Sequence, residues 1–121
     1  MVKDIEIGKK ILFAMSELDI GQGICVQEGQ VLAVEAIEGT DKMLERVADL
    51  KCVGKKPILI KMIKHHQDRD LDMPTIGINT IENLYKFGFA GCAVSVDGII
   101  VLEREKVIQR ANELGIFILG I

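Results

Sequence analysis

The chain has 121 residues, of which 49% are hydrophobic and 27% are charged, a composition that fits one globular domain and excludes a disordered protein. Its net charge of -3 argues against a protein that binds nucleic acid through overall positive charge, so no nucleic-acid partner is expected. No apolar run approaches the roughly 20 residues of a membrane-spanning helix, and the chain start lacks the apolar segment of a secretory signal. We therefore expect a cytoplasmic protein.

The first half of the chain predicts a helix, a hairpin, a second helix and a strand. Residues 5–18 carry apolar side chains at helical spacing, and residues 24–36 form two apolar stretches around the turn signal Glu28-Gly29. Thr40 is a good N-cap for the second helix. The side chains which that helix should bury are Met43, Leu44, Val47 and Leu50. Residues 57–62 are typical of a buried strand.

The second half begins with an unusually long polar segment. Most connections in compact domains are short, and long ordered loops are often functional. The dipeptide Asp97-Gly98 is a strong hairpin signal. The elements expected in order are a polar loop over 64–77, a helix capped by Asn79 or Thr80 and ended by Gly88, a hairpin over 92–102, a helix over 103–114 and a strand over 116–119.

The predicted elements repeat, since each half contains a helix, two strands, a helix and a strand. The segments 23–26 and 91–94 also occupy equivalent places before the two predicted turns. The sequence therefore predicts one α/β domain over residues 1–121, with a mixed sheet built from two similar αββαβ halves and helices packed on the sheet. The alternative is that strand-strand-helix units simply recur, as they do in many α/β domains.

The cysteines Cys25, Cys52 and Cys92 lie among apolar neighbours, and none forms a C-x-x-C pair. This pattern predicts small, reduced core residues. A zinc site is disfavoured by the spacing, and a disulfide scaffold is disfavoured by the cytosolic character of the chain.

The polar loop contains the most concentrated acidic side chains of the chain. Asp68, Asp70 and Asp72 alternate with other residues, so in an extended segment they project to one side. Crowded carboxylates repel unless a cation neutralises them, which favours Mg²⁺ with oxygen ligands. Pro74 restricts the preceding residue to an extended conformation and so places Asp72 on a rigid segment just before a helix. A solvated acidic loop is the alternative.

A second candidate site is the segment Glu38-Gly39-Thr40-Asp41. Gly39 allows a ligand to approach the backbone closely, and the amides at the start of the following helix can hold a phosphate. Ordinary capping of that helix is the alternative. The segment is not a Walker A loop, because it contains no G-K-[ST].

Four segments are distinctive when taken together. They are L-D-I-G-Q-G at 18–23, V-L-A-V-E-A-I-E-G-T-D at 31–41, Q-D-R at 67–69 and D-M-P-T-I-G at 72–77. In this order they resemble the LpxI-type UDP-2,3-diacylglucosamine pyrophosphatases, over essentially the whole chain. The resemblance is to the C-terminal domain of that family. The N-terminal Rossmann-like domain of full-length members has no match here, so we expect it to be missing from this chain.

The resemblance implies an enzyme of lipid A biosynthesis in Gram-negative bacteria. Such an enzyme hydrolyses the pyrophosphate of a lipid-linked UDP-sugar in a Mg²⁺-dependent reaction, with water attacking phosphorus. The substrate would be UDP-2,3-diacylglucosamine, and the products would be 2,3-diacylglucosamine 1-phosphate (lipid X) and UMP. A lipid-linked substrate further implies peripheral contact with the inner membrane.

The resemblance also implies which residues form the site. Asp72 first, and Asp68 second, are expected to be catalytic and to ligate the metal. The residues expected to bind the substrate or its phosphates are Glu38, Gly39, Thr40, Asp41, Gln67, Arg69 and Thr75.

The predicted edges of the sheet suggest how the chain would associate with another copy. A small aliphatic domain with exposed strand edges is prone to pair with another copy, so we expect a homodimer. The alternative to an enzyme is therefore a non-catalytic module, which binds the substrate and dimerises when it is separated from the N-terminal domain.

Overall fold

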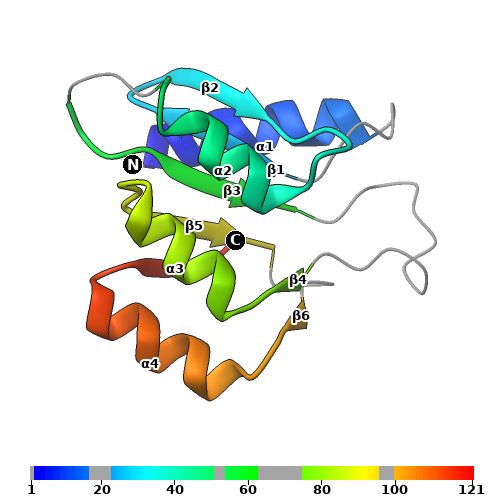
Figure 1. The fold of residues 1–121 in the computed structure, drawn as a ribbon. Coiled ribbons are helices and arrows are strands. Elements are labelled where there is room, and N and C mark those ends of the chain that lie inside the picture. Colours follow the sequence, from blue (N-terminus) through cyan, green and yellow to red (C-terminus); the bar gives the residue numbers. More distant parts are fainter. Residues whose placement is uncertain (1, 17–22, 51–53, 63–74, 96–99) are drawn as a thin grey trace.

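The computed structural model describes residues 2–16, 23–50, 54–62, 75–95 and 100–121 (Figure 1). In these ranges a five-stranded mixed sheet, in the order β2-β1-β3-β5-β7, packs against four helices, which confirms the predicted α/β class. None of the helices in the same ranges combines the length and apolar character needed to cross a membrane. The elements are α1 (Val2–Ser16), β1 (Gly23–Gln27), β2 (Gln30–Val34), α2 (Thr40–Val47), β3 (Ile58–Lys61), β4 (Thr75–Ile76), α3 (Ile78–Lys86), β5 (Gly91–Val94), β6 (Ile100–Val101), α4 (Arg104–Leu114) and β7 (Phe117–Gly120).

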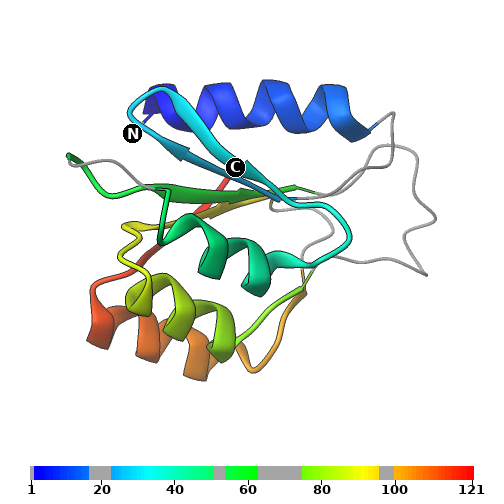
Figure 2. The same cartoon turned by 45° about the horizontal axis from the view of Figure 1, so that its top comes forward.

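The helices cover the two faces of the sheet unequally. Figure 2 shows α1 alone on one face and α2, α3 and α4 together on the other. Side chains alternate across each strand, so Ile60 of β3 joins the cluster under α1, whereas its neighbour Leu59 joins the larger cluster under the other three helices. Lys61, two residues after Leu59, therefore belongs on the face of α2 and α3.

The first hairpin forms where the sequence predicts it. Strands β1 and β2 pair antiparallel, and Glu28 and Gly29 between them have φ values of 46° and 84°. The carboxylate of Asp4 in α1 accepts the backbone N–H groups of Gly29 at 2.7 Å and Glu28 at 3.2 Å. The start of α1 thus stabilises the hairpin turn.

The prediction of a second hairpin is wrong. Strand β5 pairs in parallel with β3 and β7, and β6 pairs in parallel with β4 in a separate two-stranded sheet. The predicted turn residues 97 and 98 lie outside the described residues. The order of elements does recur in the two halves, but the pairing does not, and α1 and α3 lie on opposite faces of the sheet (Figure 2). The halves are therefore not alike in structure.

Two local predictions also need correction. Leu50 is 49% exposed, because α2 ends at Val47 and no longer directs later side chains into the core. Asn79 and Thr80 do not cap α3, since the helix begins at Ile78 with Gly77 as its N-cap. The buried positions Met43, Leu44 and Val47 are confirmed.

The two cysteines in the described residues are reduced and lie in the core. Cys25 and Cys92 are both fully buried and neither forms a disulfide, as predicted. Burial disfavours the thiolate and raises the pKa of each thiol to about 12. Cys52 lies outside the described residues.

These thiols should resist alkylation in the folded protein. At pH 9 a thiol with the ordinary pKa of 9.0 is half ionised, whereas one with a pKa of about 12 is ionised in roughly one molecule in a thousand. Labelling of Cys25 and Cys92 by iodoacetamide, followed by peptide mass mapping, should be at least about 100-fold slower in the folded than in the urea-denatured protein. Similar rates in the two states would contradict the burial of these thiols.

Candidate functional site

A pocket opens where the carboxyl end of β3 meets the amino ends of α2 and α3. It has a volume of about 680 Å³. In α/β proteins, ligands commonly bind in the crevice beyond the carboxyl ends of parallel strands, and β3 and β5 are such strands. The lining residues are Thr40, Asp41, Lys61, Gly77, Ile78, Asn79, Thr80, Leu102 and Glu103.

Two helices begin at this pocket. Helix α2 starts after Gly39, whose φ of 89° suits a residue without a side chain, and the N–H of Met43 donates to the Gly39 carbonyl at 3.2 Å. Helix α3 starts after Gly77, whose carbonyl accepts the N–H of Thr80 at 3.1 Å. The first-turn amides of a helix have no acceptor within the helix, and the helix dipole is positive at this end. Two such ends therefore favour an anion in the pocket.

Lys61 supplies a cation to the same pocket. It is the last residue of β3 and is only 6% exposed. Burial lowers the pKa of its ammonium group, whereas the nearby negative charges of Glu35 and Asp41 act in the opposite direction. The backbone carbonyl of Lys61 accepts the N–H of Ser95 at 3.0 Å, which fixes the end of β3 against the end of β5.

A buried glutamate connects β2 to the start of α2. Glu35 is 8% exposed, and its backbone N–H donates to the carbonyl of Gly23 at 2.9 Å. The hydroxyl of Thr40 donates to the Glu35 carboxylate. Thr40 is thus the first residue of α2 and not its N-cap, because its hydroxyl is directed to Glu35 instead of to the helix amides.

Removing this hydroxyl should destabilise the fold. We expect Thr40→Val, which keeps the shape of the side chain, to lower the free energy of unfolding by about 1.5–3 kcal/mol, because a buried carboxylate then loses a hydrogen-bond donor. Thr40→Ser keeps the hydroxyl and should lose less than about 1 kcal/mol. Urea unfolding measures both variants, and equal losses would show that the hydrogen bond is unimportant.

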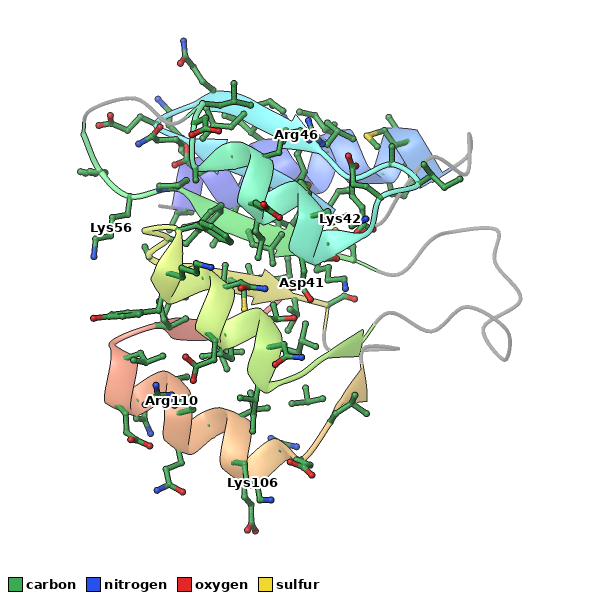
Figure 3. All side chains as sticks on the ribbon, viewed as in Figure 1. Asp41, Lys42, Arg46, Lys56, Lys106 and Arg110 are labelled. Carbon is green, nitrogen blue, oxygen red and sulfur yellow. The ribbon has the colours of Figure 1, made fainter. Side chains whose placement is uncertain are left out.

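Of the sequence-predicted site residues that the structure describes, only some line the pocket. Thr40 and Asp41 line the pocket, and Asp41 lies at the end of α2 that faces the start of α3 (Figure 3). Gly39 precedes them as the N-cap of α2. Glu38 does not line the pocket, since its carboxylate contacts Arg46 at 3.3 Å and accepts the N–H of Ala36 at 2.9 Å.

The remaining predicted residues belong to the long loop or its end. Thr75 begins β4 and pairs with Ile100 of β6. Asp72, Asp68, Gln67 and Arg69 lie outside the described residues. The roles expected for them stay predictions.

Sequence reasoning missed other pocket residues. Lys61 had a visible signal, because it interrupts the apolar stretch I-L-I-K-M-I at the end of a predicted buried strand. The sequence around Asn79 and Thr80 indicates only a helix cap. Glu103 gave no signal, because it reaches the pocket through the chain path that connects β6 to α4.

Known proteins resemble this chain over nearly its full length. The family model described as the LpxI C-terminal domain matches residues 1–119. The UDP-2,3-diacylglucosamine pyrophosphatase LpxI of Caulobacter vibrioides is 43% identical over 124 residues, which cover 98% of this chain and 44% of that protein. The chain therefore spans less than half the length of this curated relative. The family match covers the strands, helix starts and pocket residues described above, so the chain belongs to the LpxI C-terminal domain family.

Proposed function

We propose that this domain, as the C-terminal part of a longer enzyme, hydrolyses the pyrophosphate bond of UDP-2,3-diacylglucosamine. Water attacks phosphorus, the P–O–P bond breaks, and the products are lipid X and UMP. The observation that supports this proposal is the pocket in which two helix starts and Lys61 meet, because such a pocket suits a phosphate group. The relative from Caulobacter vibrioides carries the name of this activity.

The residues of the pocket would have different roles in binding the substrate and the metal. The first-turn amides of α2 and α3 would bind phosphate oxygens, and the Glu35–Thr40 hydrogen bond would hold the start of α2 in place. The pocket also offers the carboxylates of Asp41 and Glu103, oxygen donors of the kind that Mg²⁺ prefers. Bound Mg²⁺ would neutralise negative charge on the pyrophosphate.

Asp72 and Asp68 are proposed as further carboxylates of the site. Asp72 precedes Thr75 by three residues, so its Cα lies within about 11 Å of the Thr75 Cα in any conformation. Thr75 starts β4, which leads through Gly77 into the pocket. We therefore propose that Asp72 reaches this pocket, where it would ligate the metal or accept a proton from water.

Mg²⁺ should bind weakly to this chain alone. Among the described residues there is no group of three or more His, Cys, Asp or Glu side chains that could hold a metal ion. Protein sites for Mg²⁺ often use one or two carboxylates and complete the coordination with substrate phosphates and water. Calorimetric titration should therefore give a millimolar-range dissociation constant, on the order of 1 mM, without substrate. Micromolar binding would show a preformed site.

The activity can be tested by recombining domains. This chain, the separately produced N-terminal domain and their mixture are each incubated with UDP-2,3-diacylglucosamine and Mg²⁺, and lipid X is quantified. We expect turnover only in the mixture or in the full-length protein. Absence of lipid X from the full-length protein would overturn the proposed function.

A second candidate function is a non-catalytic module that binds substrate and dimerises. The sheet order favours it, because β2 and β7 are the outer strands and expose Val31 (41%) and Leu119 (39%). We propose a homodimer, in the cytoplasm and at the inner-membrane surface where a lipid-linked substrate lies. Sedimentation at micromolar concentration tests the dimer, and a dimer that binds substrate without turnover in any mixture would favour this function.

A further inference from the structure

Lys61 is a charged residue at a position where the strand is otherwise apolar. All residues of β3 are buried, and Lys61 is only 6% exposed although it lines the pocket. Burying an ammonium group is unfavourable unless opposite charges or hydrogen bonds compensate. A methionine or leucine would fill the same place on β3 without that cost, so the charge itself calls for an explanation.

The surroundings of Lys61 keep the ammonium group beside negative charge. The carboxylates of Glu35 and Asp41 both act on it. Glu35 is buried and accepts the hydroxyl hydrogen of Thr40, whereas Asp41 is exposed at the start of α2. Of the two negative charges near the lysine, Glu35 is therefore the buried one and Asp41 is the one accessible from solvent.

The elements that meet at Lys61 all favour an anion with several oxygens. The first turn of α2, with Thr40 and Asp41, and the first turn of α3, from Ile78 to Thr80, line the same pocket. Lysine donates to phosphate as a compact point charge. We propose that Lys61 binds a phosphoryl oxygen of the pyrophosphate substrate in this pocket. The inference rests on the proposed function for the identity of the substrate, and it assigns the phosphate contact to a residue of β3.

A purely structural role makes a different prediction. If Lys61 only neutralises Glu35, its replacement lowers stability and leaves anion affinity unchanged. If Lys61 binds the phosphoryl group, loss of its charge lowers affinity in a protein that is still folded. Stability and binding are therefore measured separately for each variant.

The probe is magnesium pyrophosphate, titrated calorimetrically into this chain. Lys61→Met removes the charge but keeps a long apolar side chain, and we expect it to weaken binding by about 10-fold or more, the effect of losing one charge-assisted hydrogen bond. Lys61→Arg keeps the charge and should stay within about 3-fold of the original affinity, because arginine also donates to phosphate.

Two lysines serve as matched controls. Lys42 is exposed in the first turn of α2 next to Asp41, and Lys56 is exposed near the amino end of β3, away from the pocket (Figure 3). Lys56→Met should change affinity by less than about 3-fold, because its exposed charge is distant from the pocket and is screened by salt. Lys42→Met keeps the first-turn backbone amide and should weaken binding less than Lys61→Met does. An effect of Lys42→Met as large as that of Lys61→Met would indicate general electrostatics and overturn the assignment.

A second measurement does not depend on folding of a variant. In the unaltered chain with ¹³C-labelled lysine, the Cε signal of Lys61 should shift when magnesium pyrophosphate is added, and that of Lys56 should not. An unmoved Lys61 signal, unchanged affinity in folded Lys61→Met, or no pyrophosphate binding by the unaltered chain would each overturn the inference. Lys61-dependent pyrophosphate binding without hydrolysis by the full-length protein would refute the proposed function and leave this inference standing.

Discussion

Asp72→Ala in the longer enzyme proposed above is expected to abolish pyrophosphate hydrolysis. Loss of a metal ligand or a general base should lower the turnover number by at least about 100-fold. The free energy of unfolding should change by less than about 1 kcal/mol, since a carboxylate in a polar segment is not a core residue. Substrate affinity should survive, because we expect other residues to contact the acyl chains and the uridine. Steady-state kinetics and thermal melts measure both parts of the prediction.

The conservative variant decides between chemistry and local structure. Asp72→Asn keeps an oxygen that would cap a turn, if one forms before Pro74 and Thr75, but removes the negative charge. If Asp72 only stabilises that turn, Asp72→Asn retains near-normal turnover, and the catalytic role would then be assigned to Asp68. If Asp72 ligates the metal or accepts a proton, Asp72→Asn loses activity almost as completely as Asp72→Ala.

Gly91→Ala should strongly destabilise the five-stranded sheet. A Cβ atom at position 91 would lie 2.4 Å from the backbone oxygen of Phe117 and 2.4 Å from its ring atom Cδ2. The backbone oxygen belongs to β7, which pairs with β5 at this register, so it cannot move without disturbing the sheet. We expect a loss of at least about 3 kcal/mol in the free energy of unfolding. The melting temperature should fall by about 10 °C or more.

Gly77→Ala is the matched control for this steric effect. Among the residues that the structure describes, a Cβ atom there would meet Leu102 alone, at 3.8 Å, an ordinary van der Waals contact. The φ of Gly77 is -145°, which any residue adopts. Gly77→Ala should lower the free energy of unfolding by less than about 1 kcal/mol. Denaturant unfolding of both variants would contradict the packing described for β5 and β7 if the two losses were equal.

The sequence by itself predicted the elements whose signals are local. The apolar spacing of α1, the Glu28-Gly29 turn of the first hairpin and the apolar run of β3 each lie within one short segment, and the structure contains all three. Periodicity and turn chemistry depend on neighbouring residues, so a single sequence is enough to read them. The family resemblance was equally readable, because its motifs are contiguous.

Strand β5 shows that local sequence signals do not determine which strands pair. Asp97-Gly98 predicted a hairpin, yet β5 forms parallel ladders with both β3 and β7 and occupies a central place in the sheet. A central strand satisfies its backbone groups on both sides and buries all four of its residues, from Gly91 to Val94. This stabilisation of β5 depends on pairing with β7, which follows α4 in the chain. A local turn dipeptide carries no information about that pairing.

Some residues of the pocket could be predicted from the sequence, whereas others are brought there only by the tertiary structure. The segment Gly39-Thr40-Asp41 predicted a helix start that can hold an anion, and Thr40 and Asp41 do line the pocket. The sequence did not indicate that Lys61 and the start of α3 would join them, because β3 and α3 reach the pocket only after the parallel strands align their carboxyl ends. Composition and local pattern determined the α/β class, most elements and the family of this protein. Tertiary packing alone decided the strand order, the burial of Lys61 and the meeting of two helix starts, since these depend on contacts between segments distant in the chain.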